Sequence, residues 1–151
     1  MKIGVFPGSF DPITIGHESV ILRSLPLFDK VILAIGVNSL KQNMFSLDQR
    51  KHALARCFSN YSKISVDSYE GLTIEYCKKV NAHHIIRGLR ISADFEYERN
   101  IALMNRELNP DIETIFLISE PQHSAITSTV VRDIYKNGGD ISRFVPKGFE
   151  V

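Results

Sequence analysis

The sequence lacks the features that mark secreted, cysteine-stapled or membrane-spanning proteins. Its two cysteines, Cys57 and Cys77, form no CxxC or Cys/His spacing, which argues against a disulfide framework. The longest apolar run, Val31 to Val37, is far shorter than the roughly 20 residues that cross a bilayer. At the N-terminus, Pro7 and Gly8 interrupt the chain before a signal-peptide apolar segment could form. We therefore expect a cytoplasmic protein with no membrane segment.

The chain also lacks an excess of charge of either sign. Eighteen basic and seventeen acidic residues give a formal net charge of +1. A protein that holds nucleic acid or an anionic membrane through its overall field needs a larger positive charge. We expect neither partner, and any site for an anion must be local.

Two common nucleotide-binding motifs are absent as well. The sequence contains no G-x-G-x-x-G and no G-x-x-x-x-G-K-[ST], so neither the dinucleotide fingerprint nor the P-loop is present. It also shows no internal repeat, low-complexity tract or linker. With 151 residues, of which 44% are hydrophobic, the chain is expected to form a single domain over residues 1–151.

Short apolar, β-branched runs alternate with helix-like stretches along the whole chain. Runs of this kind, apolar on both faces, are typical of buried parallel strands, and parallel neighbours need crossover helices. The pattern predicts an α/β fold with a doubly wound, five-stranded parallel sheet and a ligand crevice at the carboxyl ends of the strands. The expected strands are Lys2–Phe6, Lys30–Val37, Lys63–Ser68, His84–Ile86 and Glu113–Ile118, and the expected helices are Gly16–Leu27, Leu47–Phe58, Leu72–Val80 and Ser92–Leu108.

The segment after the first strand is suited to a phosphate. It reads P-G-S-F-D-P from Pro7 and then T-I-G-H, so that Gly8 and Gly16 allow close approach of the backbone and Ser9 supplies a hydroxyl. His17 is expected in the first turn of a helix, where free N–H groups favour an anion. Taken alone, His17 is more simply explained as a histidine bonded to a neighbouring loop.

A second segment of this kind follows the fifth strand. It reads I-T-S-T-V-V-R from Ile126 and places three hydroxyl residues at a helix start, with an arginine one turn further on. Taken alone it could be only a helix cap. Together, the TxGH segment and this helix start resemble the paired signature of the nucleotidyltransferase superfamily, whose members have a Rossmann-like fold.

Three further segments narrow the resemblance. They are K-x-x-M-F from Lys41, I-R-G-L-R from Ile86, and A-D-F-E-Y-E from Ala93 followed by M-N-R from Met104. With PGSFDPIT, they make almost the whole chain similar to the bacterial phosphopantetheine adenylyltransferases. That family transfers AMP from ATP to 4′-phosphopantetheine, giving dephospho-coenzyme A and pyrophosphate.

The resemblance implies a role for each residue that matches the family pattern. It assigns His17, Lys41 and Arg90 to catalysis by charge stabilisation, without a covalent intermediate. Residues implied to bind the acceptor are Ser9, Lys41, Thr73, Arg87 and Asn105. Residues implied to bind ATP are Ser9, Phe10, His17, Gly88, Leu89, Arg90, Glu98, His123, Ser124, Ala125, Ile126, Thr127, Ser128 and Thr129.

The same resemblance implies partners and an assembly. It implies Mg²⁺ bound mainly through the ATP phosphates, with no metal site of protein ligands, and feedback inhibition by coenzyme A. It also implies a homohexamer. The sequence departs from the family at His123 and Thr127, where tryptophan and serine are common, and it ends at Val151, where relatives often continue into a last helix.

Other interpretations remain open from the residues themselves. Lys41, Arg87 and Arg90 could be solvated surface charges, and Asp94, Glu98 and Asn105 could be a solvated helix face. The adjacent histidines His83 and His84 suggest a metal site, but neighbouring strand residues point to opposite faces. For function, the alternatives are a sister enzyme acting on nicotinamide mononucleotide or glycerol phosphate, and a non-catalytic nucleotide-binding regulator.

Overall fold

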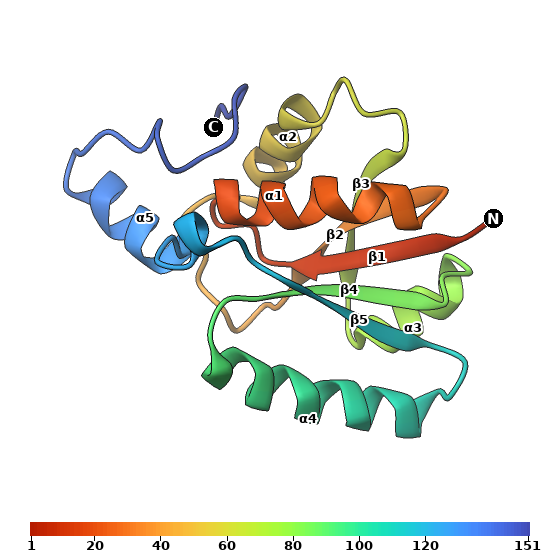
Figure 1. The fold of residues 1–151 in the computed structure, drawn as a ribbon. Coiled ribbons are helices and arrows are strands. Elements are labelled where there is room, and N and C mark those ends of the chain that lie inside the picture. The colour runs from red at the N-terminus through yellow and green to blue at the C-terminus, as the bar shows by residue number, and fades with distance from the viewer.

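A computed structural model describes residues 1–151 as five strands, five α-helices and two short 3₁₀ turns (Figure 1). The strands are β1 (Ile3–Gly8), β2 (Lys30–Val37), β3 (Ile64–Glu70), β4 (His84–Leu89) and β5 (Glu113–Ile118). The helices are α1 (Ile15–Ser24), α2 (Leu47–Cys57), α3 (Thr73–Lys79), α4 (Ser92–Leu108) and α5 (Ser128–Lys136), and the 3₁₀ turns are η1 (Leu25–Leu27) and η2 (Pro121–His123). No helix is long and apolar enough to cross a membrane.

The strands form one parallel sheet in the order β3-β2-β1-β4-β5. The chain moves outward from β1 through β2 to β3, returns to β4 on the other side of β1, and continues to β5. The winding direction therefore reverses between β1 and β4, which is where an open parallel sheet binds its ligands. The predicted doubly wound α/β fold is confirmed.

Helices cover both faces of the sheet, so alternate strand residues enter two different cores. Phe6, Leu33 and Ile86 pack on one face in a cluster with residues of α1 and α2. On the other face Val5 and Ile32 pack in a second cluster with residues of α3. Figure 1 shows α1 and α2 above the sheet and α4 below it. This double burial explains why the strands are apolar on both faces.

Two element boundaries differ from the sequence prediction in ways that matter for the site. Strand β4 continues past Ile86 to Leu89, so Arg87 and Gly88 belong to the sheet and do not follow it. Helix α1 ends at Ser24 because Pro26 lacks a backbone N–H, and the chain closes in a 3₁₀ turn. The last helix, whose end the sequence left open, finishes at Lys136.

Helix α4 is oriented with its polar side toward the sheet. Apolar residues of this segment, among them Tyr97, Met104 and Leu108, form a stripe at helical spacing, which correctly predicts the helix over Ser92–Leu108. These three side chains are nevertheless exposed. The one buried side chain of the helix is that of Glu98. These three side chains therefore form an outer surface, while Ile101 lies on a cavity wall and Asp94 and Glu98 of the acidic side line the interior.

Phe149 is one of the side chains that join the C-terminal segment to the body of the protein. Val131 of α5 packs with Ile141 and Val145 in a third, small cluster. Phe149 contacts both this cluster and the large core beneath α1 and α2, and its ring lies 6.2 Å from that of Phe45. Phe149 thus connects α5 to the rest of the protein.

We expect Phe149→Ala to lower the free energy of unfolding by about 1–3 kcal/mol, because a partly buried ring that joins two clusters is removed. Val151→Ala is the matched control at a residue beside it that is 43% exposed, and we expect it to change stability by less than about 0.5 kcal/mol. Urea unfolding followed by circular dichroism measures both variants. Equal stability of the two variants would contradict this role of Phe149.

Candidate active site

Two cavities meet at the carboxyl edge of β1 and β4. The first, of about 320 Å³, lies between the starts of α1 and α5 and the end of β4. The second, of about 240 Å³, extends away from it between β3, α3 and α4. Five residues line both cavities and form their shared wall: Pro7, Gly8, Ser9, Arg87 and Glu98. A group bound in one cavity therefore meets a group bound in the other at this wall.

Arg87 holds the shared wall together where β1 and β4 separate. The ladder between these strands pairs only Gly4 with His84 and Val5 with Ile85. Beyond it, the Arg87 guanidinium donates from NH1 to the Pro7 carbonyl oxygen at 2.7 Å and from Nε to Glu98 Oε2 at 2.9 Å. Its NH2 group donates to Glu98 Oε1, which makes the ion pair with α4 bidentate.

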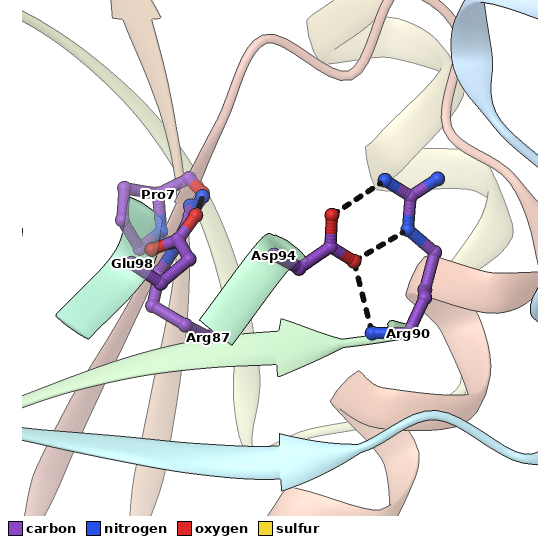
Figure 2. A network of polar contacts seen from close by, with 5 residues as sticks. All are labelled: Pro7, Arg87, Arg90, Asp94 and Glu98. Atoms are coloured by element: carbon purple, nitrogen blue, oxygen red, sulfur yellow. Dashed lines mark hydrogen bonds and ion pairs between the residues drawn. The ribbon is translucent and has the colours of Figure 1, made fainter. Parts of the chain in front are cut away.

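Arg90 is paired with a second carboxylate of α4, one turn before Glu98. Asp94 Oδ2 accepts from the Arg90 backbone N–H at 3.0 Å and from Nε at 3.1 Å, and Oδ1 accepts from NH2 at 3.2 Å (Figure 2). Burial alone would raise the pKa of Asp94, but the hydrogen bonds from Arg90 outweigh it and hold that pKa below its usual range. Both arginines are therefore charge-balanced by carboxylates of α4.

His17 takes part in the cap of α1. The backbone N–H of Thr14 donates to His17 Nδ1 at 3.1 Å, and the backbone N–H of His17 donates to Thr14 Oγ1 at 3.4 Å. Because Nδ1 accepts a hydrogen bond from an obligate donor, the ring proton lies on Nε2. Phe6 and Phe10 pack edge-on against the ring, at centroid distances of 6.4 and 5.5 Å.

The surroundings of His17 keep its ring neutral. Burial, followed by the positive charges of Arg87 and Arg90, lowers the pKa of His17 to about 4. At neutral pH the side chain is therefore an uncharged Nε2–H donor in the first turn of a helix and on the wall of the first cavity. Such a donor can stabilise negative charge on a phosphate oxygen without itself losing or gaining a proton.

Side chains of α5 dock its N-terminus against the loop that follows β1. Ser128 Oγ donates to the Pro12 carbonyl oxygen at 2.8 Å, and Arg132 donates to the Asp11 carbonyl oxygen at 2.8 Å. Thr127 caps the helix by accepting from the Val130 N–H at 3.2 Å. The N-termini of α1 and α5 therefore both border the first cavity, whose wall includes Gly16, Ser128 and Thr129, and the first N–H groups of a helix have no acceptor within their own helix.

Two buried charged residues that sequence reasoning missed position the loops around Ser9. Asp11 accepts the Met44 and Phe45 N–H groups, each at 2.8 Å. Arg50 donates to the Ser9 carbonyl oxygen at 2.8 Å and to the Phe45 carbonyl oxygen at 3.1 Å. The sequence gives a weak signal for Asp11, in the turn F-D-P, and none for Arg50, whose partners are backbone atoms of distant loops.

The structure brings together most of the residues that the sequence assigned to a site. Those on the wall of the first cavity are Ser9, His17, Arg87, Gly88, Arg90, Glu98, Ile126, Thr127, Ser128 and Thr129. Those on the wall of the second are Ser9, Thr73, Arg87, Glu98 and Asn105. Those on neither wall are Phe10, Lys41, Leu89, His123, Ser124 and Ala125.

Two of the residues outside the cavities, Phe10 and Lys41, differ in how they relate to the site. Phe10 is buried, at a positive φ of 46°, and its ring supports His17. Its ring also lies 3.1 Å from where a side chain on Gly8 would begin, so Gly8 must stay small. Lys41 is exposed in the loop between β2 and α2, and its assignment to the site stays a prediction.

The remaining candidate groups do not form a metal site or a reactive thiol. No three His, Cys, Asp or Glu side chains gather where they could hold a metal ion. His83 lies against the Asp111 carbonyl oxygen, and the His84 ring packs against Phe28. Burial raises the pKa of Cys57 to about 11 and that of Cys77 to about 12, so both thiols stay protonated.

Comparison with known proteins identifies the class first. The cytidylyltransferase-like family model matches residues 5–134, which span both cavities and the sheet. The fold, the paired helix starts and this match together define a nucleotidyltransferase.

Curated relatives then identify the family within that class. The chain is 53% identical to the phosphopantetheine adenylyltransferase of Flavobacterium psychrophilum over 100% of this chain and 99% of the relative. It is 44% identical to that of Leptospira biflexa over 96% of this chain and 91% of the relative. The chain belongs to the phosphopantetheine adenylyltransferase family.

Solved structures share the fold at low sequence identity. A putative nicotinate-nucleotide adenylyltransferase from Vibrio parahaemolyticus has a TM-score of 0.74 at 23% identity and covers 96% of this chain and 94% of that one. A bifunctional NMN adenylyltransferase/ADP ribose pyrophosphatase from Francisella tularensis has a TM-score of 0.72 at 21% identity, covering 95% of this chain and 44% of that one. Both confirm the Rossmann-like architecture.

The lowered pKa of His17 predicts how stability depends on pH. The usual pKa of histidine is 6.5 and the folded value is about 4, so the unfolded chain takes up the proton first. The contribution of His17 to stability is complete above pH 6.5 and is lost as the pH falls toward 4.

Unfolding measured by denaturant at pH 7, 6, 5 and 4.5 tests this dependence. Wild type is expected to lose more stability over that range than His17→Gln, and NMR titration should give His17 a midpoint near 4. Parallel pH profiles of the two proteins, or a midpoint near the ordinary histidine value, would contradict the assignment.

Proposed function

We propose that the protein transfers AMP from ATP to 4′-phosphopantetheine, producing dephospho-coenzyme A and pyrophosphate in coenzyme A biosynthesis. Membership of the phosphopantetheine adenylyltransferase family supports this reaction. The observation that carries it is the pair of cavities that share one wall at Ser9, Arg87 and Glu98. The reaction joins two substrates at one phosphate, and this arrangement gives each substrate a compartment and the reacting phosphates a common boundary.

The proposed chemistry is a direct in-line displacement. A phosphate oxygen of 4′-phosphopantetheine attacks the α-phosphorus of ATP, a P–O bond forms, and the bond to the leaving pyrophosphate breaks. No covalent nucleophile is needed, which agrees with the protonated state of both thiols. Catalysis then depends on positioning and on stabilising the charge that spreads over the phosphate oxygens.

Each cationic or donor group has a distinct proposed place in that step. His17 Nε2–H donates to the α-phosphate, and the first N–H groups of α5 bind the rest of the triphosphate. Arg87 binds the acceptor phosphate from the shared wall, and Arg90 binds the nucleotide phosphates from the end of β4. Lys41, on a loop outside the cavities, approaches when both substrates are bound and follows the shifting charge.

Magnesium enters this proposal as part of the substrate. Both carboxylates that line the first cavity, Asp94 and Glu98, are occupied by arginine. With no protein cage for a cation, the ATP phosphates are left as the ligands of Mg²⁺, and Mg²⁺ prefers phosphate and water oxygens.

The exposed stripe of α4 supports the proposal of a homohexamer. Tyr97, Met104 and Leu108 are 68%, 64% and 55% exposed, and Ile118 of the neighbouring edge strand is 73% exposed. Large apolar side chains that are exposed in this way are typical of an interface between subunits. We also propose that coenzyme A inhibits by occupying both cavities, and that the protein acts in the cytoplasm, where its two free cysteines stay reduced.

A panel of acceptors tests the function. The purified protein is incubated with MgATP and, in turn, 4′-phosphopantetheine, nicotinamide mononucleotide or glycerol phosphate, and again with MgCTP. Pyrophosphate release is expected only with ATP and 4′-phosphopantetheine. Release with another acceptor would assign a sister enzyme, and ATP binding without release for any acceptor would assign a non-catalytic regulator.

His17→Ala is expected to lower kcat by about 10²- to 10³-fold, because one donor to the charge that develops in the transition state is lost. The dissociation constant of ATP is expected to change far less. Turnover and ATP binding are measured separately, by pyrophosphate release and by calorimetry. Equal losses in both would show that His17 only binds the ground state.

A further inference from the structure

The second cavity contains a tyrosine, Tyr69, that neither motif nor family resemblance singled out. Tyr69 lies near the end of β3, and its register partner on β2 is Gly36. The Tyr69 hydroxyl lies 3.4 Å from where a side chain on Gly36 would begin. The missing side chain at Gly36 lets the Tyr69 ring lie over β2, toward the wall that contains Arg87, and both residues line this cavity.

The Tyr69 ring is fixed on several sides. It stacks on Tyr76 of α3, with the ring centroids 4.7 Å apart and the planes at 22°. Tyr76 in turn donates from its hydroxyl to Asp67 Oδ2 at 2.7 Å. The Tyr69 hydroxyl bonds to Thr73 Oγ1 at 2.7 Å, in the first turn of α3. A tyrosine held in this way presents its hydroxyl at one defined position.

The pair of hydroxyl groups suits an amide. In the bond between Tyr69 and Thr73 only one hydroxyl donates, so the pair keeps one free O–H proton and free lone pairs. An amide carries one N–H donor and one carbonyl acceptor, which can bond to a free lone pair and to the free O–H proton of the two hydroxyl groups. The rest of the cavity wall is mixed, with Ile101 and Ala102 of α4 providing apolar surface and Asn105 a second amide partner.

We infer that Tyr69 is a specificity-determining residue: its hydroxyl and the Thr73 hydroxyl form hydrogen bonds with an amide of the acceptor's flexible arm. The inference rests on the proposed function, because the arm belongs to 4′-phosphopantetheine. The end of β3 then distinguishes phosphorylated acceptors that contain an amide from those that do not. Arg87 then binds the phosphate that both kinds of acceptor share.

The test is Tyr69→Phe, which keeps the ring and its stacking and removes only the hydroxyl. Calorimetry gives the dissociation constants of 4′-phosphopantetheine, of ATP, and of n-butyl phosphate, which has the phosphate but no amide. We expect binding of 4′-phosphopantetheine to weaken about 3- to 10-fold, as for one lost neutral hydrogen bond, while the other two constants stay unchanged. Thr73→Val should act in the same direction, and the double variant should be less than additive.

Tyr76→Phe is the matched control, because it removes a hydroxyl from the same aromatic stack but not from the cavity wall. If Tyr69 had a purely structural role, Tyr69→Phe and Tyr76→Phe would change the binding of 4′-phosphopantetheine alike, and that result would overturn the inference. So would an unchanged constant for 4′-phosphopantetheine in Tyr69→Phe, or an equal loss for n-butyl phosphate. Failure of the wild type to bind 4′-phosphopantetheine, with ATP binding intact, would instead overturn the proposed function and the inference with it.

Discussion

The guanidinium of Arg87 connects the elements that meet where the sheet reverses direction. β1 and β4 pair over only two residues, and beyond them Arg87 joins the Pro7 carbonyl of β1 to the Glu98 carboxylate of α4. Three of its five N–H groups are used in this way. Arg87 also lines both cavities, and a guanidinium held in one orientation suits the planar, bidentate recognition of a phosphate that we propose.

Charge balance explains how a chain with a net charge of +1 can build a site for two phosphorylated substrates. The inward carboxylates of α4 neutralise Arg87 and Arg90, so no large unpaired charge has to be buried. The neutral His17 and the helix N-termini add donors without adding formal charge. Because the carboxylates of α4 face inward, much of its apolar stripe faces outward, which supports the proposed assembly.

Most of the fold followed from patterns that are local in the sequence. The central strands β1 and β2 are short runs that are apolar on both faces because they are buried on both faces, and β2 and β5 have the predicted bounds. The helix α4 was also predicted, but spacing alone could not say which of its sides faces the sheet. That depends on Arg87 of β4 and on Arg90 in the turn before α4, which pair with Glu98 and Asp94 and hold the acidic side of the helix inward.

The candidate site was predictable where its residues follow strands or begin helices, as Ser9, His17 and Ser128 do. Asp11 and Arg50 were missed, because they act on backbone atoms 34 and 41 residues away and no local pattern records such contacts. The predicted place of Lys41 in the site needs a bound substrate to be seen.

We propose that Arg87 recognises the acceptor phosphate by the fixed orientation of its guanidinium and not by its charge alone. Arg87→Lys keeps the charge and removes the planar fork, so calorimetric titration with 4′-phosphopantetheine separates the two. We expect Arg87→Lys to bind 4′-phosphopantetheine about 10- to 100-fold more weakly than wild type, the loss expected for hydrogen bonds to a charged group. Binding as tight as in wild type would contradict it.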